Sequence, residues 1–551
     1  MEEFASLFQG FATALTPFNL VLMFTGILLG VIIGVLPGLG GANGVAILLP
    51  LTFSLAKAPG GATSAIILLS CIYWGALFGG AITSILFNIP GEPWSVATTF
   101  DGHPMAQQGR ADEALTAAFT SSFIGAFVAV LVVTFLAPPI ARFAVKFGPP
   151  EYFAVFFLTF ASFVGMGKGS AAKTIAAMCL GFALGAVGLD KVTGTLRMTF
   201  DQEHLLGGFD FLIAVIGLFG LGEILSSMES GLKFGGTQAK IRLNAVLHTW
   251  KKLLAYWVTS IRSCIVGCWM GITPGGATPA SFMAYGLAKR FSPRGDKFGK
   301  GEIEGVVAPE TAAHAAGTSA LLPMLTLGIP GSPTAAVLLG ALLMWGLQPG
   351  PMLFVEQKDF VWGLIASMYL GNLAGLIVVL TCVPLFAAIL RIPFSIIAPM
   401  ILVICVVGAY TVKNSMFDVW VMLLFGVAGY GFNKLGYPLA PLVLAIILGD
   451  KAEEAFRQAL LGSQGSLLVF WYDANTGINW LAGSIMTLGL ALIAMPMFEW
   501  ARGLSRRPPP AAAAVAPAAG TGPSSGSASS AAAPSSPAVA RASAAVQPVA
   551  P

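Results

Sequence analysis

Proline and glycine stand together at four points inside long apolar runs, where a continuous membrane helix cannot form. The run from 326 to 339 reads TLGIPGSPTAAVLL, with Pro330 and Gly331 at its centre. Proline lacks a backbone N–H and disrupts the helical turn before it, and an unpaired backbone group in hydrocarbon costs several kcal/mol. Such breaks persist only where protein or water satisfies the freed groups, which can then bind a ligand. Half-helix amino ends attract anions, and unwound carbonyls suit sodium or similar cations.

The four breaks form two pairs with the same order and similar spacing. NIPGEP at 88–93 corresponds to GIPGSP at 328–333, about 240 residues later. GVLPGLGGANG at 34–44 precedes the first of these, and GITPGGATPA at 271–280 precedes the second. A single Pro-Gly kink in a membrane helix is commonly plain packing, whereas duplication of both clusters indicates an internal structural repeat.

Glycines and small polar residues beside the breaks are the candidate substrate ligands. Their side chains could add hydrogen bonds to those of the freed backbone, although for any one serine or threonine the alternative is a bond back to its own helix. The candidate substrate-binding residues are Gly38, Gly40, Gly41, Asn43, Asn88, Pro90, Gly91, Thr273, Gly275, Gly276, Thr278, Ser281, His314, Pro330, Gly331, Ser332 and Thr334. Sodium is expected at backbone carbonyls near Pro37, Pro90, Pro274 and Pro330.

Few ionisable side chains accompany the breaks. Glu92, Glu310 and His314 are functional candidates, because ionisable groups are costly inside a membrane. The alternatives are structural: Glu310 would stabilise the amino end of a helix, and His314 would be a hydrogen-bonded histidine near that helix start. Glu223 is interpreted as a helix-end residue close to a basic loop. The sequence holds no HExxH, paired-aspartate or nucleophile-elbow pattern, so we expect no catalytic residue, no cofactor and no enzyme.

Arginine is absent from all four clusters, so peptide dipoles would have to meet a bound carboxylate. Two converging helix ends supply about one positive charge. A dicarboxylate or tricarboxylate would remain under-compensated in a site of low dielectric constant. We therefore expect a co-bound cation, and the scarcity of ionisable groups near the breaks favours sodium over protons. Uptake into vesicles that ignored both sodium and pH gradients would contradict this hypothesis.

Composition places these segments in a membrane. Of the 551 residues, 56% are hydrophobic and only 10% are charged, against roughly 25% charged residues in an ordinary soluble domain. Apolar runs of about 20 residues recur from Phe18 to Trp500 and match helices that cross a bilayer, not the strands of a barrel. The prediction is an all-α polytopic membrane protein with about 11–13 transmembrane or re-entrant helices, arranged as two inverted-topology repeats with broken helices and hairpins.

Charge indicates how the repeats are oriented and where they end. Basic residues flank the second glycine-proline cluster on both sides, whereas Glu2 and Glu3 precede the first and only Lys57 follows it. The two clusters are therefore expected to enter from opposite faces of the membrane. Basic residues near 502–507 place the carboxyl end in the cytoplasm. We expect a first transmembrane repeat at 1–230, a second repeat with additional helices at 231–500, and a disordered, cytoplasmic Ala/Pro/Ser-rich tail at 501–551.

At these residues the chain resembles the large membrane subunit (TctA) of the tripartite tricarboxylate transporters, a bacterial family. The match extends from about Leu20 to Trp500, and its most specific parts are GVLPGLGG, YWGALFGGAITSILFNIPGEP with DGHPMAQQGRADEAL, GITPGGATPASFMAYGLAKRFS, and FGKGEIEGVVAPE with LTLGIPGSP. The resemblance implies sodium- or proton-coupled uptake of carboxylates across the bacterial inner membrane. It also implies two partners, a small four-helix membrane subunit and a periplasmic solute-binding protein.

The chain departs from the family pattern at a few positions. Ala313 and His314 stand where an Asn pair usually follows the APE motif, Ala81 stands in place of serine, and His103 in place of tyrosine. Loss of the Asn pair argues against citrate in particular. If these positions line the site, a protonatable His314 would make uptake pH-dependent. Transport measured from about pH 6 to pH 8 in wild type and His314→Asn tests that hypothesis.

The sequence as a whole predicts a secondary active, cation-coupled importer of small carboxylates. An elevator-like movement of the core follows only by analogy. The alternative is a passive anion channel, in which the breaks would form a filter, and accumulation of substrate against its gradient would exclude it. A membrane-embedded enzyme ranks third, because the sequence offers no nucleophile with a base or a metal set.

Overall fold

The computed structural model of the chain consists mainly of helices. It describes residues 2–36, 39–166, 170–190, 193–230, 241, 243–273, 276–389, 394–473 and 477–505. Met1–Trp500 forms one compact unit, and Ala501–Pro551 is a second unit. Most of the predicted tail, 506–551, lies outside the described residues, so its disorder and its cytoplasmic location stay predictions.

The first half of the chain contains ten α-helices and one short hairpin among its described residues. The helices are α1 (Glu2–Ala14), α2 (Pro17–Val35), α3 (Gly40–Ala56), α4 (Gly61–Phe87), α5 (Val96–Gln107), α6 (Ala111–Ala144), α7 (Pro149–Met166), α8 (Ala171–Gly185), α9 (Phe211–Val215) and α10 (Gly222–Ser230). Shorter turns are η1 (Pro93–Ser95), η2 (Glu203–Leu205) and the π-helical η3 (Ile216–Leu221). Strands β1 (Gly188–Leu189) and β2 (Leu196–Arg197) pair antiparallel, with Gly188 opposite Arg197.

The second half of the chain also consists mainly of helices, with one short hairpin among its described residues. Its helices are α11 (Leu243–Leu253), α12 (Trp257–Ile272), α13 (Ala277–Phe291), α14 (Glu304–Ser319), α15 (Leu321–Leu327), α16 (Pro333–Met344), α17 (Leu353–Glu356), α18 (Lys358–Ile389), α19 (Phe394–Lys413), α20 (Met416–Leu435), α21 (Leu439–Gly462) and α22 (Trp480–Ser505). Shorter turns are η4 (Leu254–Tyr256), η5 (Gly295–Lys297) and η6 (Leu467–Phe470). Strands β3 (Tyr472–Asp473) and β4 (Gly477–Ile478) pair antiparallel, with Tyr472 opposite Ile478.

Seven helical segments in the described part of the chain are long and apolar enough to cross a membrane. They are Pro17–Val35, Gly61–Phe87, Ala111–Ala144, Phe211–Glu229, Asn244–Ile272, Lys358–Ala388 and Met416–Leu435. Six shorter apolar helices accompany them, α3, α8 and α16 among them. The prediction of an all-α polytopic membrane protein is confirmed.

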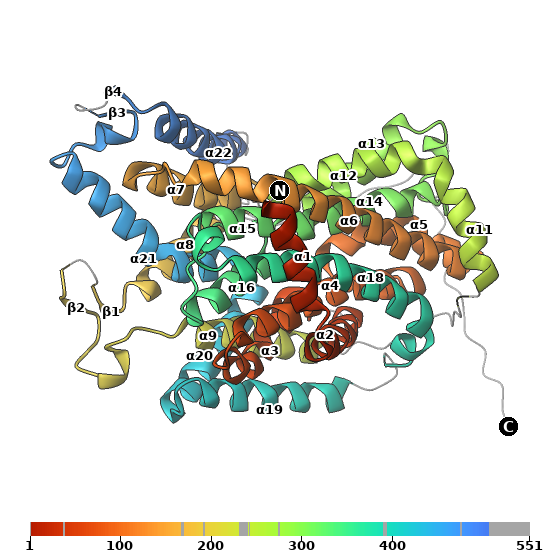
Figure 1. Cartoon of the computed structure of the whole chain (residues 1–551), viewed down its shortest axis with the longest axis horizontal. Helices are drawn as coiled ribbons and strands as arrows, with labels where there is room; N and C mark the ends of the chain where they lie inside the picture. Colours follow the sequence, from red (N-terminus) through yellow and green to blue (C-terminus); the bar gives the residue numbers. More distant parts are fainter. Residues whose placement is uncertain are drawn as a thin grey trace, which may run out of the picture. The chain divides into compact units, whose positions relative to one another are not determined.

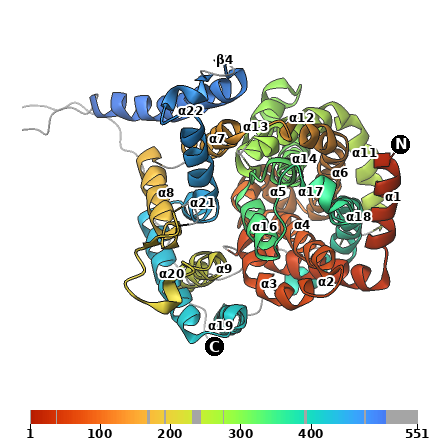
Figure 2. The ribbon, with the colours of Figure 1, turned by 60° about the vertical axis from the view of Figure 1, so that its left-hand side comes forward.

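The helices of this unit form two groups, visible in Figures 1 and 2. In one, which we call the duplicated group, α2–α6 pack with α12–α18. In the other, the flanking group, α21 packs on α7 and α8, and α20 packs on α10 and η3. Helix α3 contacts both α19 and η3, so it lies where the two groups meet.

The duplicated group contains the same succession of elements twice. Helices α2, α3 and α4 are followed by the first Ile-Pro-Gly break, α5 and α6. Helices α12, α13 and the pair α14–α15 are followed by the second Ile-Pro-Gly break, α16 and α18. Helix α4 packs on α18, and α14 packs on α6, so the central helix of each copy also lies against the last helix of the other.

Close backbone approaches are repeated in the two copies. A Cβ on Gly34 would overlap the carbonyl oxygen of Ala76, and a Cβ on Gly271 would overlap that of Ala316. The breaks then pack on these same helices: a Cβ on Gly91 would overlap Gly34 O, and one on Gly331 would overlap Gly271 O. This correspondence supports a structural duplication. The boundary at 230/231 and the inverted membrane orientation stay predictions.

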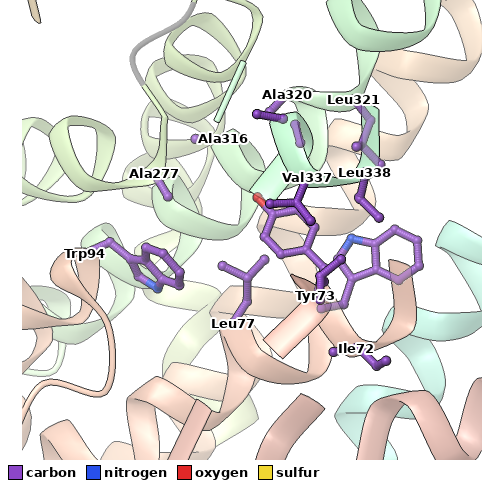
Figure 3. Close-up of a cluster of buried hydrophobic side chains, with 14 of the residues drawn as sticks. Ile72, Tyr73, Leu77, Trp94, Ala277, Ala316, Ala320, Leu321, Val337 and Leu338 are labelled. Carbon is purple, nitrogen blue, oxygen red and sulfur yellow. The ribbon is translucent and has the colours of Figure 1, made fainter. Parts of the chain in front are cut away.

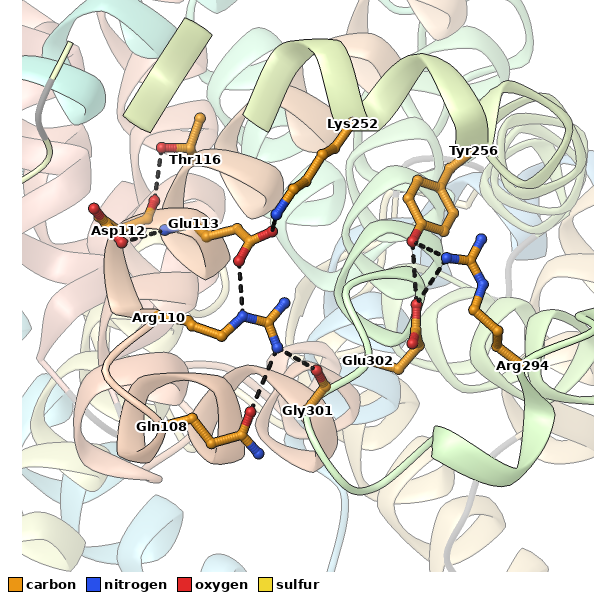
Figure 4. A network of polar contacts seen from close by, with 10 residues as sticks. All are labelled: Gln108, Arg110, Asp112, Glu113, Thr116, Lys252, Tyr256, Arg294, Gly301 and Glu302. Atoms are coloured by element: carbon orange, nitrogen blue, oxygen red, sulfur yellow. Dashed lines mark hydrogen bonds and ion pairs between the residues drawn. The ribbon is translucent and has the colours of Figure 1, made fainter. Parts of the chain in front are cut away.

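Ion pairs join the two copies at one end of α6, as Figure 4 shows. Glu113 accepts from Arg110 Nε at 2.8 Å and from Lys252 Nζ at 2.7 Å. Arg110 Nη1 also donates to the carbonyl of Gly301 at 3.1 Å. The network links the α5–α6 turn of the first copy to α11 and to the loop before α14 of the second.

We expect Lys252→Ala to lower the free energy of unfolding by no more than about 1 kcal/mol. The Lys252 side chain is 43% exposed, so water screens most of the attraction to Glu113. Arg110 remains to pair with that carboxylate. Thermal unfolding of the purified protein in detergent checks this value. A loss of more than about 2 kcal/mol would show that the network supports the fold far more than its exposure implies.

Candidate substrate-binding site

A cavity of about 630 Å³ lies where the breaks of both copies meet the flanking group. The duplicated group contributes Leu39, Gly40, Ala42, Asn43, Tyr73, Pro90, Gly91, Glu92, Pro93, Trp94, Gly276, Ala277, Thr278, Gly331, Ser332, Pro333 and Thr334. The flanking group contributes Ser162, Phe163, Phe219, Glu223, Asn433, Pro438, Leu439 and Ala440. The cavity therefore has one wall built from the repeated breaks and another built from α7, η3, α10, α20 and α21.

Local sequence explains why the helices stop at the cavity. Helix α4 ends at Asn88, whose φ is 56°, and α15 ends at Gly328, whose φ is 72°. A left-handed residue followed by X-Pro ends a helix, because the residue before proline avoids helical angles. A second proline, Pro93 or Pro333, then takes the first position of the next helical segment, where its missing N–H is no loss.

Helices α3 and α13, from corresponding places in the two copies, begin at the cavity. Helix α3 starts at Gly40, and α13 starts after Gly276, which has φ 72° and provides no side-chain cap. The N–H groups of a first helical turn carry the positive end of the helix dipole. In α3 one of them is satisfied by a carboxylate from the other break, because Gly41 N–H donates to Glu92 Oε1.

Tyr73 connects the two copies at the cavity wall. Its hydroxyl donates to the carbonyl of Gly317 at 3.2 Å and lies 3.4 Å from Ser332 Oγ. Ser332 Oγ in turn accepts from Ala335 N at 3.1 Å, which caps α16. Figure 3 shows the Tyr73 ring within a buried apolar cluster that draws side chains from α4, α14, α15 and α16. This packing fixes the second break against α4.

The cavity is acidic. Its lining among the described residues includes two carboxylates, Glu92 and Glu223, and no lysine, arginine or histidine. Glu223 accepts from Asn433 Nδ2 at 3.2 Å and directly follows the π-helical segment η3. Glu223 lies in the cavity wall, in the first turn of α10. The role near a basic loop that the sequence suggested stays a prediction, because residues 231–240 lie outside the described part of the chain. An anion in this cavity would be met by helix ends and small hydroxyls, with two acidic groups nearby.

The structure gathers much of the predicted set and leaves part of it elsewhere. Gly40, Asn43, Pro90, Gly91, Gly276, Thr278, Gly331, Ser332 and Thr334 line the cavity. The lining lacks the predicted residues Asn88, Thr273, Ser281, His314 and Pro330. It also lacks Gly41, whose N–H donates to the cavity residue Glu92. Four further predicted residues lie outside the described part of the chain: Pro37, Gly38, Pro274 and Gly275. Whether any of these residues binds substrate stays a prediction.

Two of the displaced residues bond to the protein itself. Ser281 Oγ donates to the carbonyl of Trp94 at 2.8 Å, which holds α13 to the first break. Thr273 Oγ1 donates back to Trp269 O at 2.8 Å, the intrahelical bond that the sequence left open as the alternative.

Glu310 does not begin a helix, which corrects one sequence interpretation. Helix α14 starts at Glu304 and continues through Pro309, so Glu310 and His314 lie in its interior. Glu310 accepts from Thr98 Oγ1 at 2.5 Å and from Ser122 Oγ at 3.0 Å. His314 is fully buried, with Nδ1 3.2 Å from Glu310 O and its ring against Phe78. The pair joins α14 to α5 and α6.

A second cavity of about 680 Å³ lies in the flanking region, and it does contain basic groups. Those groups are already paired. Arg197 contacts Asp190 at 2.9 Å and Glu453 at 3.1 Å, and Lys413 contacts Asp210 at 3.2 Å. The hydrogen bonds that Arg197 donates to Glu453, and then those it donates to Asp190, raise the pKa of its guanidinium above the ordinary value. A substrate carboxylate there would have to displace a carboxylate of the protein.

A multi-pass helical protein with duplicated broken helices around a cavity has an architecture typical of membrane transporters. The comparison with known families agrees: the sequence model of the Tripartite tricarboxylate transporter TctA family matches residues 20–444. The chain belongs to this family and is therefore a membrane subunit of a tripartite transporter, which implies further subunits.

Two curated relatives come from Agrobacterium vitis. An "Uncharacterized 52.8 kDa protein in TAR-I ttuC' 3'region" is 38% identical over 501 residues, which cover 90% of this chain and 97% of the relative. An "Uncharacterized protein in TAR-II ttuC' 3'region" is 37% identical over 232 residues, 42% of this chain and 93% of that relative. No solved structure matches the chain.

Proposed function

We propose that this chain is the translocating subunit of a secondary active importer that moves small dicarboxylates or tricarboxylates together with sodium. The observation that carries the proposal is the cavity of about 630 Å³ lined by the breaks of both copies. Its volume lies in the range of small-molecule sites, and its half-helix ends are the groups that transporters use for anionic substrates. The family membership supplies the transporter class.

Sodium coupling follows from the charge of the cavity. Glu92 and Glu223 line it, and no basic side chain does so among its described residues. An anion entering such a space needs a cation with it, because unpaired charge is very costly away from water. We propose that the site lies in the bacterial inner membrane with the carboxyl end in the cytoplasm. A periplasmic solute-binding protein would deliver substrate, and a small four-helix membrane subunit would complete the assembly.

Concentrative uptake by the complete assembly tests this function. Liposomes containing the full chain and the small subunit, with the binding protein outside, receive radiolabelled citrate, malate or acetate. We expect citrate or malate to accumulate above its external concentration under an inward sodium gradient, and monensin, which collapses that gradient, to abolish the accumulation. Equilibration without accumulation would instead identify a passive channel. Liposomes without the binding protein provide the matched control.

A further inference from the structure

Glu92 occupies the amino end of α3, one of the helix ends at the cavity. Glu92 is only 7% exposed, and its carboxylate accepts from Gly41 N–H in the first turn of α3. The same carboxylate packs over Gly40, where a Cβ would lie 2.9 Å from Oε2. The backbone at the amino end of α3 thus already binds a carboxylate, which the protein itself supplies.

The second copy has no such carboxylate at the corresponding place. The break at 88–93 ends in Glu92–Pro93, and the break at 328–333 ends in Ser332–Pro333. Ser332 turns back to cap its own helix, α16, through Ala335 N. The α13 end therefore faces the cavity with Gly276 and Thr278 beside it and no side-chain cap. The two copies match in backbone but differ in charge.

The same wall contains a buried donor without an acceptor. Trp94, two residues after Glu92, lines the cavity and is 8% exposed. Its indole N–H has no hydrogen-bond partner among the described residues. A buried donor left unpaired costs about 1–3 kcal/mol, so this N–H is a ready partner for an oxygen of a ligand or of a rearranged Glu92.

We propose that Glu92 is the sodium-coupling residue of this transporter: in the empty cavity its carboxylate occupies the α3 end, and sodium binding to that carboxylate frees the end for substrate. This inference rests on the proposed function. A substrate carboxylate and the Glu92 carboxylate compete for the same N–H and repel each other, so they share the cavity only when a cation lies between them. Backbone carbonyls freed at a helix break are oxygen ligands of the kind that sodium uses in transporters.

Sodium binding to the purified full chain, without any carboxylate, tests the cation half of the proposal. Binding of ²²Na⁺ in detergent is measured for wild type, Glu92→Gln and Glu92→Asp. We expect Glu92→Gln to weaken sodium binding at least tenfold and Glu92→Asp, which keeps the charge, to retain it. Glu229→Gln, a change outside the cavity at a residue paired with Lys434, is the matched control and should bind as wild type does. If Glu92→Gln folds poorly, the sodium binding of Glu92→Asp is compared with that of wild type instead. Loss of sodium binding in Glu92→Asp overturns the proposal.

Citrate and malate binding to the same proteins tests the competition. Wild type should bind one of them at least tenfold more tightly with sodium than with choline, whereas Glu92→Gln should bind it equally in both. The proposal is overturned if carboxylate binding to Glu92→Gln keeps the full sodium dependence of wild type. It is also overturned if Glu223→Gln loses this sodium dependence while Glu92→Gln retains it. If wild type binds carboxylate with no sodium effect, the inference fails and carboxylate transport stands. If wild type binds neither, the proposed function fails with it.

Discussion

Gly331→Ala should disrupt the second break and lower the free energy of unfolding by about 3 kcal/mol or more. A Cβ at this position would overlap the carbonyl oxygen of Gly271 and lie 3.0 Å from Ala320 Cα. Both obstacles are backbone atoms of buried residues, Gly271 in α12 and Ala320 at the α14–α15 junction, so neither can move aside like a flexible side chain. The break would be pushed off α12, and the cavity wall beside Ser332 would move with it.

Gly286→Ala provides the matched control for this prediction. Gly286 is exposed in α13, and a Cβ there would meet nothing within 4 Å. The change should be neutral or should stabilise the protein by about 0.5–1 kcal/mol, since alanine favours a helix interior. Thermal unfolding of the two variants in the same detergent gives the comparison. A Gly331→Ala protein as stable as wild type would mean that the backbone packing of the break is looser than described.

Asp101→Ala should be the most damaging single loss of a polar side chain, with a decrease of several kcal/mol in the free energy of unfolding. One carboxylate oxygen of Asp101 accepts from Gly299 N at 2.8 Å, Gly301 N at 3.0 Å and Glu302 N at 2.9 Å. The other oxygen accepts from Tyr285 Oη at 2.9 Å. Each buried N–H left without an acceptor costs about 1–3 kcal/mol.

The side chain holds the loop before α14 to α5, so its loss should also release the start of α14. Asp101→Asn keeps one carbonyl oxygen for the three N–H groups and should lose less than half as much stability as Asp101→Ala. Asp296→Ala, an exposed aspartate in the same loop, controls for loop charge and should change stability by less than about 0.5 kcal/mol. Equal losses in all three variants would contradict this account of the loop.

Much of the duplicated group could be predicted from local sequence. Proline and glycine have fixed backbone consequences, so the breaks at 88–93 and 328–333 and the helices on either side of them follow from a few residues. The error at Glu310 has the same origin. A helix that begins at Glu310 follows from the local pattern, yet α14 begins at Glu304 and continues through Pro309, because neighbouring helices bury this segment and support a proline inside it.

The remaining parts of the site depend on contacts between segments far apart in the chain. The Tyr73 hydroxyl donates to the carbonyl of Gly317, and Asn433 donates to Glu223. The local sequence around these residues does not indicate which partner each one has. The residue types alone indicate a contact, because a tyrosine or a glutamate in an apolar helix needs a polar partner. That rule singles out the residue and leaves its location open.

A density map of the full chain determined with sodium and citrate or malate tests the central claim most directly. The account predicts density for a carboxylate in the cavity of about 630 Å³, between the amino ends of α3 and α13 and the breaks at Gly91 and Gly331. Glu92 should have moved away from Gly41, with a cation between its carboxylate and that of the substrate. Density in the cavity beside Arg197 and Lys413, with the space between the breaks closed, would contradict it.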